Sequence, residues 1–85
     1  MPELRDNQQQ KRFEIEMNGE IVFANYRLEG ATLYIDYVES PIALRGTGAA
    51  GLIMQEIKNL ATANSWEIVP ICGYAATWLK RHAGK

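Results

Sequence analysis

Apolar and polar side chains alternate along three successive stretches in the first half of the chain. In residues 13–17 every second side chain is apolar, which is the period of a strand with one buried face. Residues 20–29 and 33–38 are two further apolar-rich stretches of strand length. Asn18-Gly19 and Glu29-Gly30 separate the three, and Asn-Gly is a sequence that favours a tight type I′ turn. The pattern predicts an antiparallel meander of three strands.

In the second half of the chain the apolar positions take a helical period. Between residues 49 and 63 they recur at spacings of three and four, which predicts an amphipathic helix. Residues 66–71 then indicate a short strand, and residues 75–82 a second helix. A strand reached through a helix usually pairs in parallel by a right-handed crossover. We therefore expect an α+β fold, β-β-β-α-β-α, in which a parallel strand extends the three-stranded antiparallel meander.

The two ends of the chain differ in composition. Residues 1–12 contain one large apolar side chain, Leu4, and cannot bury enough surface to offset the entropy of ordering. We expect a disordered arm there and a single domain over residues 13–85. With 85 residues in all, the domain is near the lower size limit for one hydrophobic core. Packing, a ligand or homo-oligomer formation would have to stabilise it.

Charge and cysteine content exclude several classes of protein. The net charge is −1 and no long basic run is present, which argues against a nucleic-acid partner. The uncharged stretch at residues 46–55 is too short to span a bilayer, so we expect no membrane partner and a cytoplasmic location. Cys72 is the one cysteine, which leaves no internal disulfide, and no set of Cys and His has zinc-ligand spacing. We therefore predict no metal site.

A glycine loop, Arg45-Gly46-Thr47-Gly48-Ala49-Ala50, stands between a predicted strand and the amphipathic helix. Gly46 and Gly48 allow backbone conformations closed to other residues, and the free amides and dipole at a helix start favour an anion. Arg45 could add a charge-assisted contact to phosphate. The alternative is that the glycines only make a turn. The Rossmann fingerprint is only partly met, and the Walker pattern is absent.

The same six residues resemble the acetyl-CoA signature R/Q-x-x-G-x-G/A of the GNAT N-acetyltransferases. Residues 39–48, then Val69-Pro70-Ile71-Cys72, then Arg81-His82 are in addition similar to the minimal GNAT-like proteins of the YjdJ type, which keep little beyond the acetyl-CoA-binding core. The resemblance covers residues 13–82. It implies a truncated GNAT-like fold and an acetyl-CoA or CoA cofactor.

In the resembling family the loop amides hold the pyrophosphate, and the pantetheine arm runs between two splayed strands. Pro70 fits such a splay because it cannot donate to a strand ladder, although it could equally end an edge strand. The cofactor-binding residues that the resemblance implies are Val38, Ser40, Arg45, Gly46, Thr47, Gly48, Ala49, Ala50, Pro70 and Tyr74.

Three residues are candidates for catalysis. Cys72 lies where the acetyl end of the cofactor would sit and could act as a nucleophile, or it could be a small buried hydrophobe. Glu39 could act as a base, or as a solvated carboxylate. His82 could assist as an acid or base, or interact with the C-terminal end of its helix. This chain has Tyr37-Val38 where the minimal family usually has His-Thr, and a tyrosine is a poor base at neutral pH.

We consider three functions. The first is an acyltransferase that moves the acetyl group of acetyl-CoA to an unidentified amine on a small molecule or protein. The alternative is a non-catalytic CoA-binding or protein-interaction module that keeps the fold. A third is a purely structural interaction protein that uses Tyr26, Tyr34 and Trp78 as exposed aromatic side chains.

Overall fold

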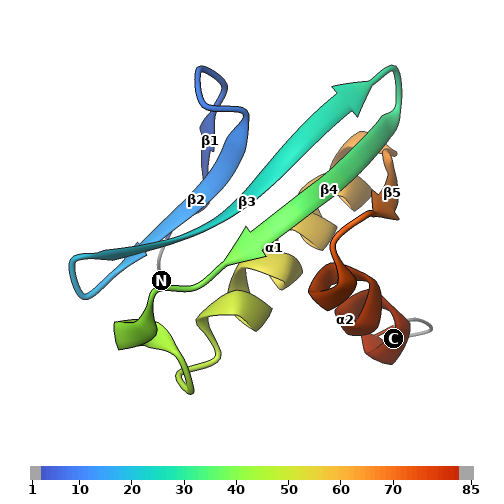
Figure 1. The fold of residues 1–85 in the computed structure, drawn as a ribbon. Coiled ribbons are helices and arrows are strands. Elements are labelled where there is room, and N and C mark those ends of the chain that lie inside the picture. The colour runs from blue at the N-terminus through green and yellow to red at the C-terminus, as the bar shows by residue number, and fades with distance from the viewer. Residues whose placement is uncertain (1–2, 83–85) are drawn as a thin grey trace.

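The sheet of this protein has five strands in the order β1-β2-β3-β4-β5, with two helices beside it (Figure 1). The computed structural model describes residues 3–82. Strands β1 to β4 pair antiparallel and β5 joins β4 in parallel, so the α+β meander with a parallel extension is confirmed. The elements are β1 (Arg5–Asn7), β2 (Arg12–Met17), β3 (Glu20–Glu29), β4 (Thr32–Glu39), a 3₁₀ turn η1 (Ile42–Leu44), α1 (Ala49–Asn64), β5 (Glu67–Pro70) and α2 (Gly73–His82).

The turn between β2 and β3 is the one that the sequence predicts. Asn18 and Gly19 both have positive φ, 54° and 78°, as a type I′ turn requires. The register that follows places Met17 opposite Glu20.

Strand β1 was not expected, because it lies in the segment that the sequence predicts to be a disordered arm. Arg5–Asn7 pairs with β2, and the order is therefore β-β-β-β-α-β-α. Polar contacts hold it beside the partly buried Leu4: Glu14 on β2 accepts hydrogen bonds from Arg5 and Asn7. Residues 1–2 of the predicted arm, and 83–85 of the predicted domain, lie outside the described residues.

The hydrophobic core lies between one face of the sheet and the helices. Alternate side chains of β2, β3 and β4 are buried on this face, and Ile53 and Ile57 of α1 pack against them. Ala75 and Trp78 of α2 belong to the same cluster. The opposite face of the sheet carries charged pairs such as Arg27–Asp36. The period-two and helical patterns of the sequence thus identify the core-facing sides correctly.

The expectation of exposed aromatic residues at an interface is wrong for two of the three. Tyr26 and Trp78 are each 8% exposed, because Tyr26 stacks on Phe13 and Trp78 packs between the helices and the sheet. Among residues 3–82, no helix is long and apolar enough to cross a membrane.

Candidate functional site

The glycine loop follows β4 and leads directly into α1. Gly46 and Gly48 both have φ of +84°, a left-handed conformation that side chains other than hydrogen rarely adopt. Gly48 is the N-cap of α1 and makes no side-chain cap hydrogen bond. A Cβ atom built at Gly46 or Gly48 would meet nothing within 4 Å. Both glycines therefore face open space.

The amides at this end of α1 are available to a ligand. Leu52 is the first residue whose N–H bonds back into the helix, to the Gly48 carbonyl at 2.9 Å. Within the part of the chain that the structure describes, the N–H groups of Gly48, Ala49, Ala50 and Gly51 have no hydrogen-bond acceptor. Four free donors at the positive end of a sixteen-residue helix form an arrangement that favours an anion.

A hollow of about 220 Å³ lies in front of these amides. Seven of the ten predicted cofactor-binding residues line it, and Leu44 and Gly51 complete the lining. The seven are Ser40, Arg45, Gly46, Gly48, Ala49, Ala50 and Tyr74. The other three lie elsewhere: the hydroxyl of Thr47 turns back to donate to the Leu44 carbonyl, and Val38 and Pro70 are in the strands β4 and β5.

Ser40 presents a hydroxyl that has no partner. Its Oγ is buried and makes no hydrogen bond with any of the described residues. Leaving a buried polar atom unpaired costs roughly 1–3 kcal/mol. Because Ser40 lines the hollow, a ligand in it could pair with this hydroxyl.

Arg45, Glu39 and Tyr37 form a chain of polar contacts at the entrance to the loop. Arg45 Nη2 lies 3.6 Å from Glu39 Oε2, and its side chain is 64% exposed. The hydroxyl of Tyr37 donates to Glu39 Oε1. This hydrogen bond and the charge of Glu39 raise the pKa of Tyr37, so the phenol stays protonated. An exposed ion pair of this kind is weak, so a phosphate could displace Glu39 from Arg45.

The sheet changes its pairing beside these residues. Tyr26 pairs with Ile35 but Asn25 pairs with Tyr37, so Asp36 is the extra residue of a β-bulge in β4. The parallel pairing with β5 stops at the same place, at Ile35 opposite Pro70. Strand β4 continues for four more residues without β5. Pro70 is thus the last residue of a strand that stops pairing where β4 bulges.

Cys72 lies just beyond this point, between β5 and α2. The amides of Ile71 and Cys72 both donate to the Ile35 carbonyl, at 2.9 and 3.0 Å, and fix the chain as it leaves β5. The thiol is free and partly buried. It is near enough to Tyr37 and Tyr74 to contribute to raising the pKa of both phenols.

Tyr74 extends from the first turn of α2 toward the loop. Its hydroxyl would be 3.8 Å from a Cβ built at Gly51, an ordinary van der Waals distance, so the Tyr74 side chain lies against the first turns of α1. Burial is the main reason why the pKa of Tyr74 is raised, and the hydroxyl is therefore a proton donor at neutral pH.

His82, the third candidate for catalysis, is not near the glycine loop. It ends α2, about ten residues and hence roughly 15 Å along the helix from Gly73. Its ring stacks on Trp78 at 3.9 Å, and Nδ1 lies 2.8 Å from the Trp78 carbonyl. The structure brings Cys72 and Glu39 to the same end of the sheet and leaves His82 at the far end of α2.

Sequence reasoning missed three features of this site. The bulge at Asp36 has no signal in the sequence that we can identify. The contact of Tyr37 with Glu39 could have been found, because residues i and i+2 of a strand have their side chains on the same face. The position of Gly51 opposite Tyr74 and Trp78 could also have been found, because a glycine inside a helix costs about 1 kcal/mol and often has a packing reason.

A strand, a left-handed glycine loop and a helix with free amides, followed by a parallel strand, define a small α+β domain with an arrangement that favours an anion at the start of α1. The chain belongs to the GCN5-related N-acetyl-transferase family, whose model matches residues 12–84. The likeness to GNAT proteins that the loop indicates is thereby confirmed for the family, while the YjdJ type stays a prediction. A search of curated proteins gives no match to this chain.

Proposed function

We propose that this domain binds acetyl-CoA through the amides that begin α1, and transfers its acetyl group to an amine. The observation that carries the proposal is the set of free N–H groups from Gly48 to Gly51 in front of an open hollow. Membership of an N-acetyltransferase family supports the choice of acetyl-CoA among phosphate-containing ligands.

The residues around the loop fit a pyrophosphate and the start of a pantetheine arm. Gly46 and Gly48 leave the main chain open to close approach, and the exposed Arg45 guanidinium could bind a phosphate oxygen. The unpaired hydroxyl of Ser40 offers one more hydrogen bond. Residues 36–39 of β4, which no longer pair with β5, have main-chain groups free for an extended amide-containing arm.

When bound, acetyl-CoA would supply an activated thioester that an amine can attack. Glu39 is the carboxylate in position to accept the proton that the amine loses, and the Tyr37 hydroxyl orients it. Breaking the C–S bond would release CoA as a thiolate, and Tyr74, which holds a proton at neutral pH, is the residue that would donate that proton to it. The N-terminal end of α2, beside Cys72, favours negative charge at this point.

Binding is tested by thermal unfolding with acetyl-CoA, CoA, AMP and NAD. A ligand that binds only the folded chain raises its apparent stability by mass action. We expect acetyl-CoA and CoA to raise Tm more than AMP and NAD do at equal concentration. No shift with either CoA species at millimolar concentration would contradict the proposal.

Two observations favour a second function: Glu39 already contacts Arg45 and Tyr37, and position 37 is a tyrosine where the resembling minimal proteins have a histidine. The domain would then be a non-catalytic CoA-binding module. Incubation with acetyl-CoA and a panel of amines, followed by measurement of released CoA, separates the two. Intact-mass measurement of wild type and Cys72→Ala tests Cys72 directly, since an acetyl adduct that the substitution removes identifies the thiol as the acceptor.

A further inference from the structure

The inner face of the sheet extends beyond the helix that covers it. Along β3 the inward side chains Val22, Ala24 and Tyr26 are 0%, 0% and 8% exposed, but the next one, Leu28, is 41% exposed. Helix α1 ends at Asn64, and Ser65 takes a left-handed conformation that stops it. Leu28 therefore lies on the core-facing side of the sheet with no helix over it.

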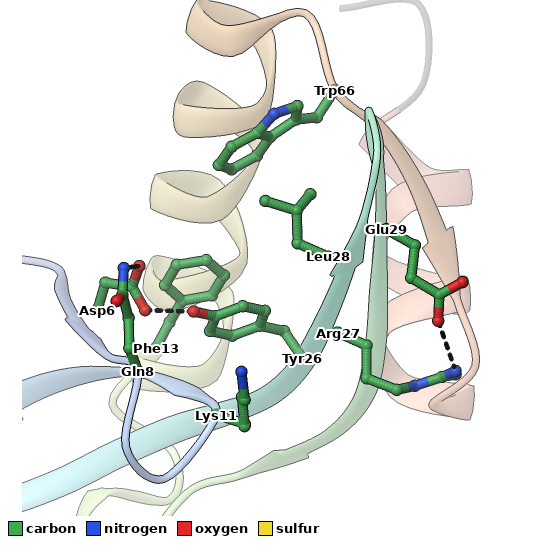
Figure 2. A pocket seen from close by; sticks show the side chains of 9 residues that line it. All are labelled: Asp6, Gln8, Lys11, Phe13, Tyr26, Arg27, Leu28, Glu29 and Trp66. Carbon is green, nitrogen blue, oxygen red and sulfur yellow. Dashed lines mark hydrogen bonds and ion pairs between the residues drawn. The ribbon is translucent and has the colours of Figure 1, made fainter.

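A hollow of about 550 Å³ occupies this place. Its walls include the Phe13–Tyr26 pair, stacked at 4.2 Å, together with Leu28 and Trp66. Figure 2 shows the Trp66 indole above Leu28 and the two stacked rings below it. A volume of this size is in the range of small-molecule sites, and flat apolar walls suit a flat apolar ligand. We call it the Lys11–Trp66 pocket.

The polar groups at its edge are all engaged except one. The Tyr26 hydroxyl donates to Asp6 at 2.5 Å, and burial raises the pKa of Tyr26 to about 12, so this hydrogen bond persists at neutral pH. Arg27 pairs with Asp36 and Glu29, on the other side of β3 from the rings (Figure 2).

Lys11 is the exception. Its ammonium has no carboxylate within ion-pair distance among residues 3–82. In Figure 2 it points toward the space beside the Tyr26 ring. The one cation of the pocket that is not neutralised therefore lies at the edge of its aromatic wall.

The backbone holds Lys11 at this edge in an unfavourable conformation. Its φ is +55°, which costs a residue with a side chain roughly 1–2 kcal/mol. The Lys11 carbonyl accepts a hydrogen bond from the Tyr26 amide at 3.0 Å, and the Lys11 amide donates one to the Gln8 carbonyl. Glycine or asparagine would suit this turn better. A lysine here is consistent with a role for its side chain.

We infer that the Lys11–Trp66 pocket binds a small organic acid with a flat apolar body, whose carboxylate pairs with Lys11 and whose ring lies against Leu28 and Trp66. Phe13 and Tyr26, only 1% and 8% exposed, form the floor beneath them. The site is independent of the proposed acetyl-CoA site. Its lining shares no residue with the hollow at the glycine loop, and the two lie at opposite ends of α1. Sixteen helical residues separate those ends by about 24 Å.

An NMR titration of the full chain, with ¹⁵N label, tests the inference with three probes that share the indole ring: indole-3-acetate, uncharged indole and the cation tryptamine. We expect indole-3-acetate to shift the signals of Trp66 and residues 26–28, to bind more tightly than indole, and to leave the amides of residues 46–51 unchanged. Tightest binding by tryptamine would overturn the inference, because Asp6 rather than Lys11 would then set the charge preference. Shifts confined to residues 46–51 would also overturn it.

Variants of Lys11 separate its charge from its conformation. Lys11→Gln should weaken the binding of indole-3-acetate about fivefold, which is the upper range for a solvent-exposed ion pair, and Lys11→Arg should retain binding. The exposed Lys80→Gln is the matched control and should bind as wild type does. Leu28→Ala changes a half-exposed side chain and should weaken the binding of indole-3-acetate and of indole to the same extent. Equal binding by wild type and Lys11→Gln would contradict the assignment.

Discussion

Gly48 has two separable functions at the residue scale: it allows a left-handed turn, and it leaves space in front of the helix amides. Gly48→Ala should destabilise the fold by roughly 1–2 kcal/mol through φ strain, and should also weaken CoA binding on the order of tenfold by filling that space. Urea unfolding and calorimetric titration with CoA measure the two effects.

Gly30→Ala is the matched control for this experiment. Gly30 has φ of +61° and open space around it, but it lies in the turn between β3 and β4. The control should lose a similar free energy of unfolding and keep wild-type CoA affinity. If both variants bind CoA equally well, the pyrophosphate is not held at Gly48.

Ser40 and Thr47 are hydroxyl residues of the same loop with opposite expected effects on stability. Ser40→Ala removes an unpaired buried hydroxyl, so the unliganded chain should keep its stability or gain about 1 kcal/mol, while CoA binding weakens. Thr47→Val removes the hydroxyl that donates to the Leu44 carbonyl and should cost about 1 kcal/mol. A loss of stability in Ser40→Ala would mean that the hydroxyl has a partner in solution.

The sequence predicted the residues of the site better than their contacts. Gly46, Gly48 and Ser40 could be named because glycines before a helix have a known physical use, and because the resembling family has the same order of motifs. The burial of the Ser40 hydroxyl could not be predicted, because it depends on how the chain packs after β4. The bulge at Asp36, where β4 stops pairing with β5, could not be predicted either.

At the scale of elements, β1 depends on one carboxylate. The side chain of Glu14 is only 8% exposed. Its carboxylate accepts hydrogen bonds from Arg12 at 2.6 Å, Asn7 at 3.0 Å and Arg5 at 3.3 Å. The hydrogen bond from Arg12 is the main reason why the pKa of Glu14 is lowered. The ionised Glu14 carboxylate therefore stabilises the fold at pH values above the pKa that Glu14 has in the unfolded chain. This stabilisation is lost as the pH falls through the lower pKa that Glu14 has in the folded chain.

We therefore expect the stability difference between wild type and Glu14→Gln to shrink as the pH is lowered from about 5 toward 3. Urea unfolding at a series of pH values measures it, and hydrogen exchange of the β1 amides should rise in parallel. Glu16→Gln, an exposed change on the same strand, is the control and should leave the pH profile of wild type unaltered. A difference that stays constant over this range would contradict the role of Glu14.

Strand β1 also shows why the expectation of a disordered arm is wrong for residues 5–7. The expectation rests on the lack of apolar side chains, whereas polar groups of Arg5, Asp6 and Asn7 contact the sheet beside the partly buried Leu4. Their partners, Glu14 and Tyr26, lie 9 and 20 residues away from Arg5 and Asp6. Composition carries no information about pairs at such separations, whereas the alternation in β2 and β3 is local and predicts those strands directly.

At the scale of the whole molecule, α1 separates two hollows of different chemistry. Its first turn faces the hollow at the glycine loop, and its last turn stops short of Leu28 and leaves the Lys11–Trp66 pocket. Each ligand that binds only the folded chain adds stability, about 1.4 kcal/mol at ten times its Kd. For independent sites these increments add, because neither ligand alters the occupancy of the other.

Thermal unfolding with CoA alone, indole-3-acetate alone and both together tests this arrangement. In a domain of this size each kcal/mol raises Tm by about 4–8 °C, so additive and non-additive outcomes are well separated. Additive stabilisation is expected in wild type, and Lys11→Gln should reduce only the contribution of the acid. A combined effect equal to the larger single one would mean that both ligands compete for the loop of α1. In that case the Lys11–Trp66 pocket is not a separate site, while CoA binding at the loop still stands.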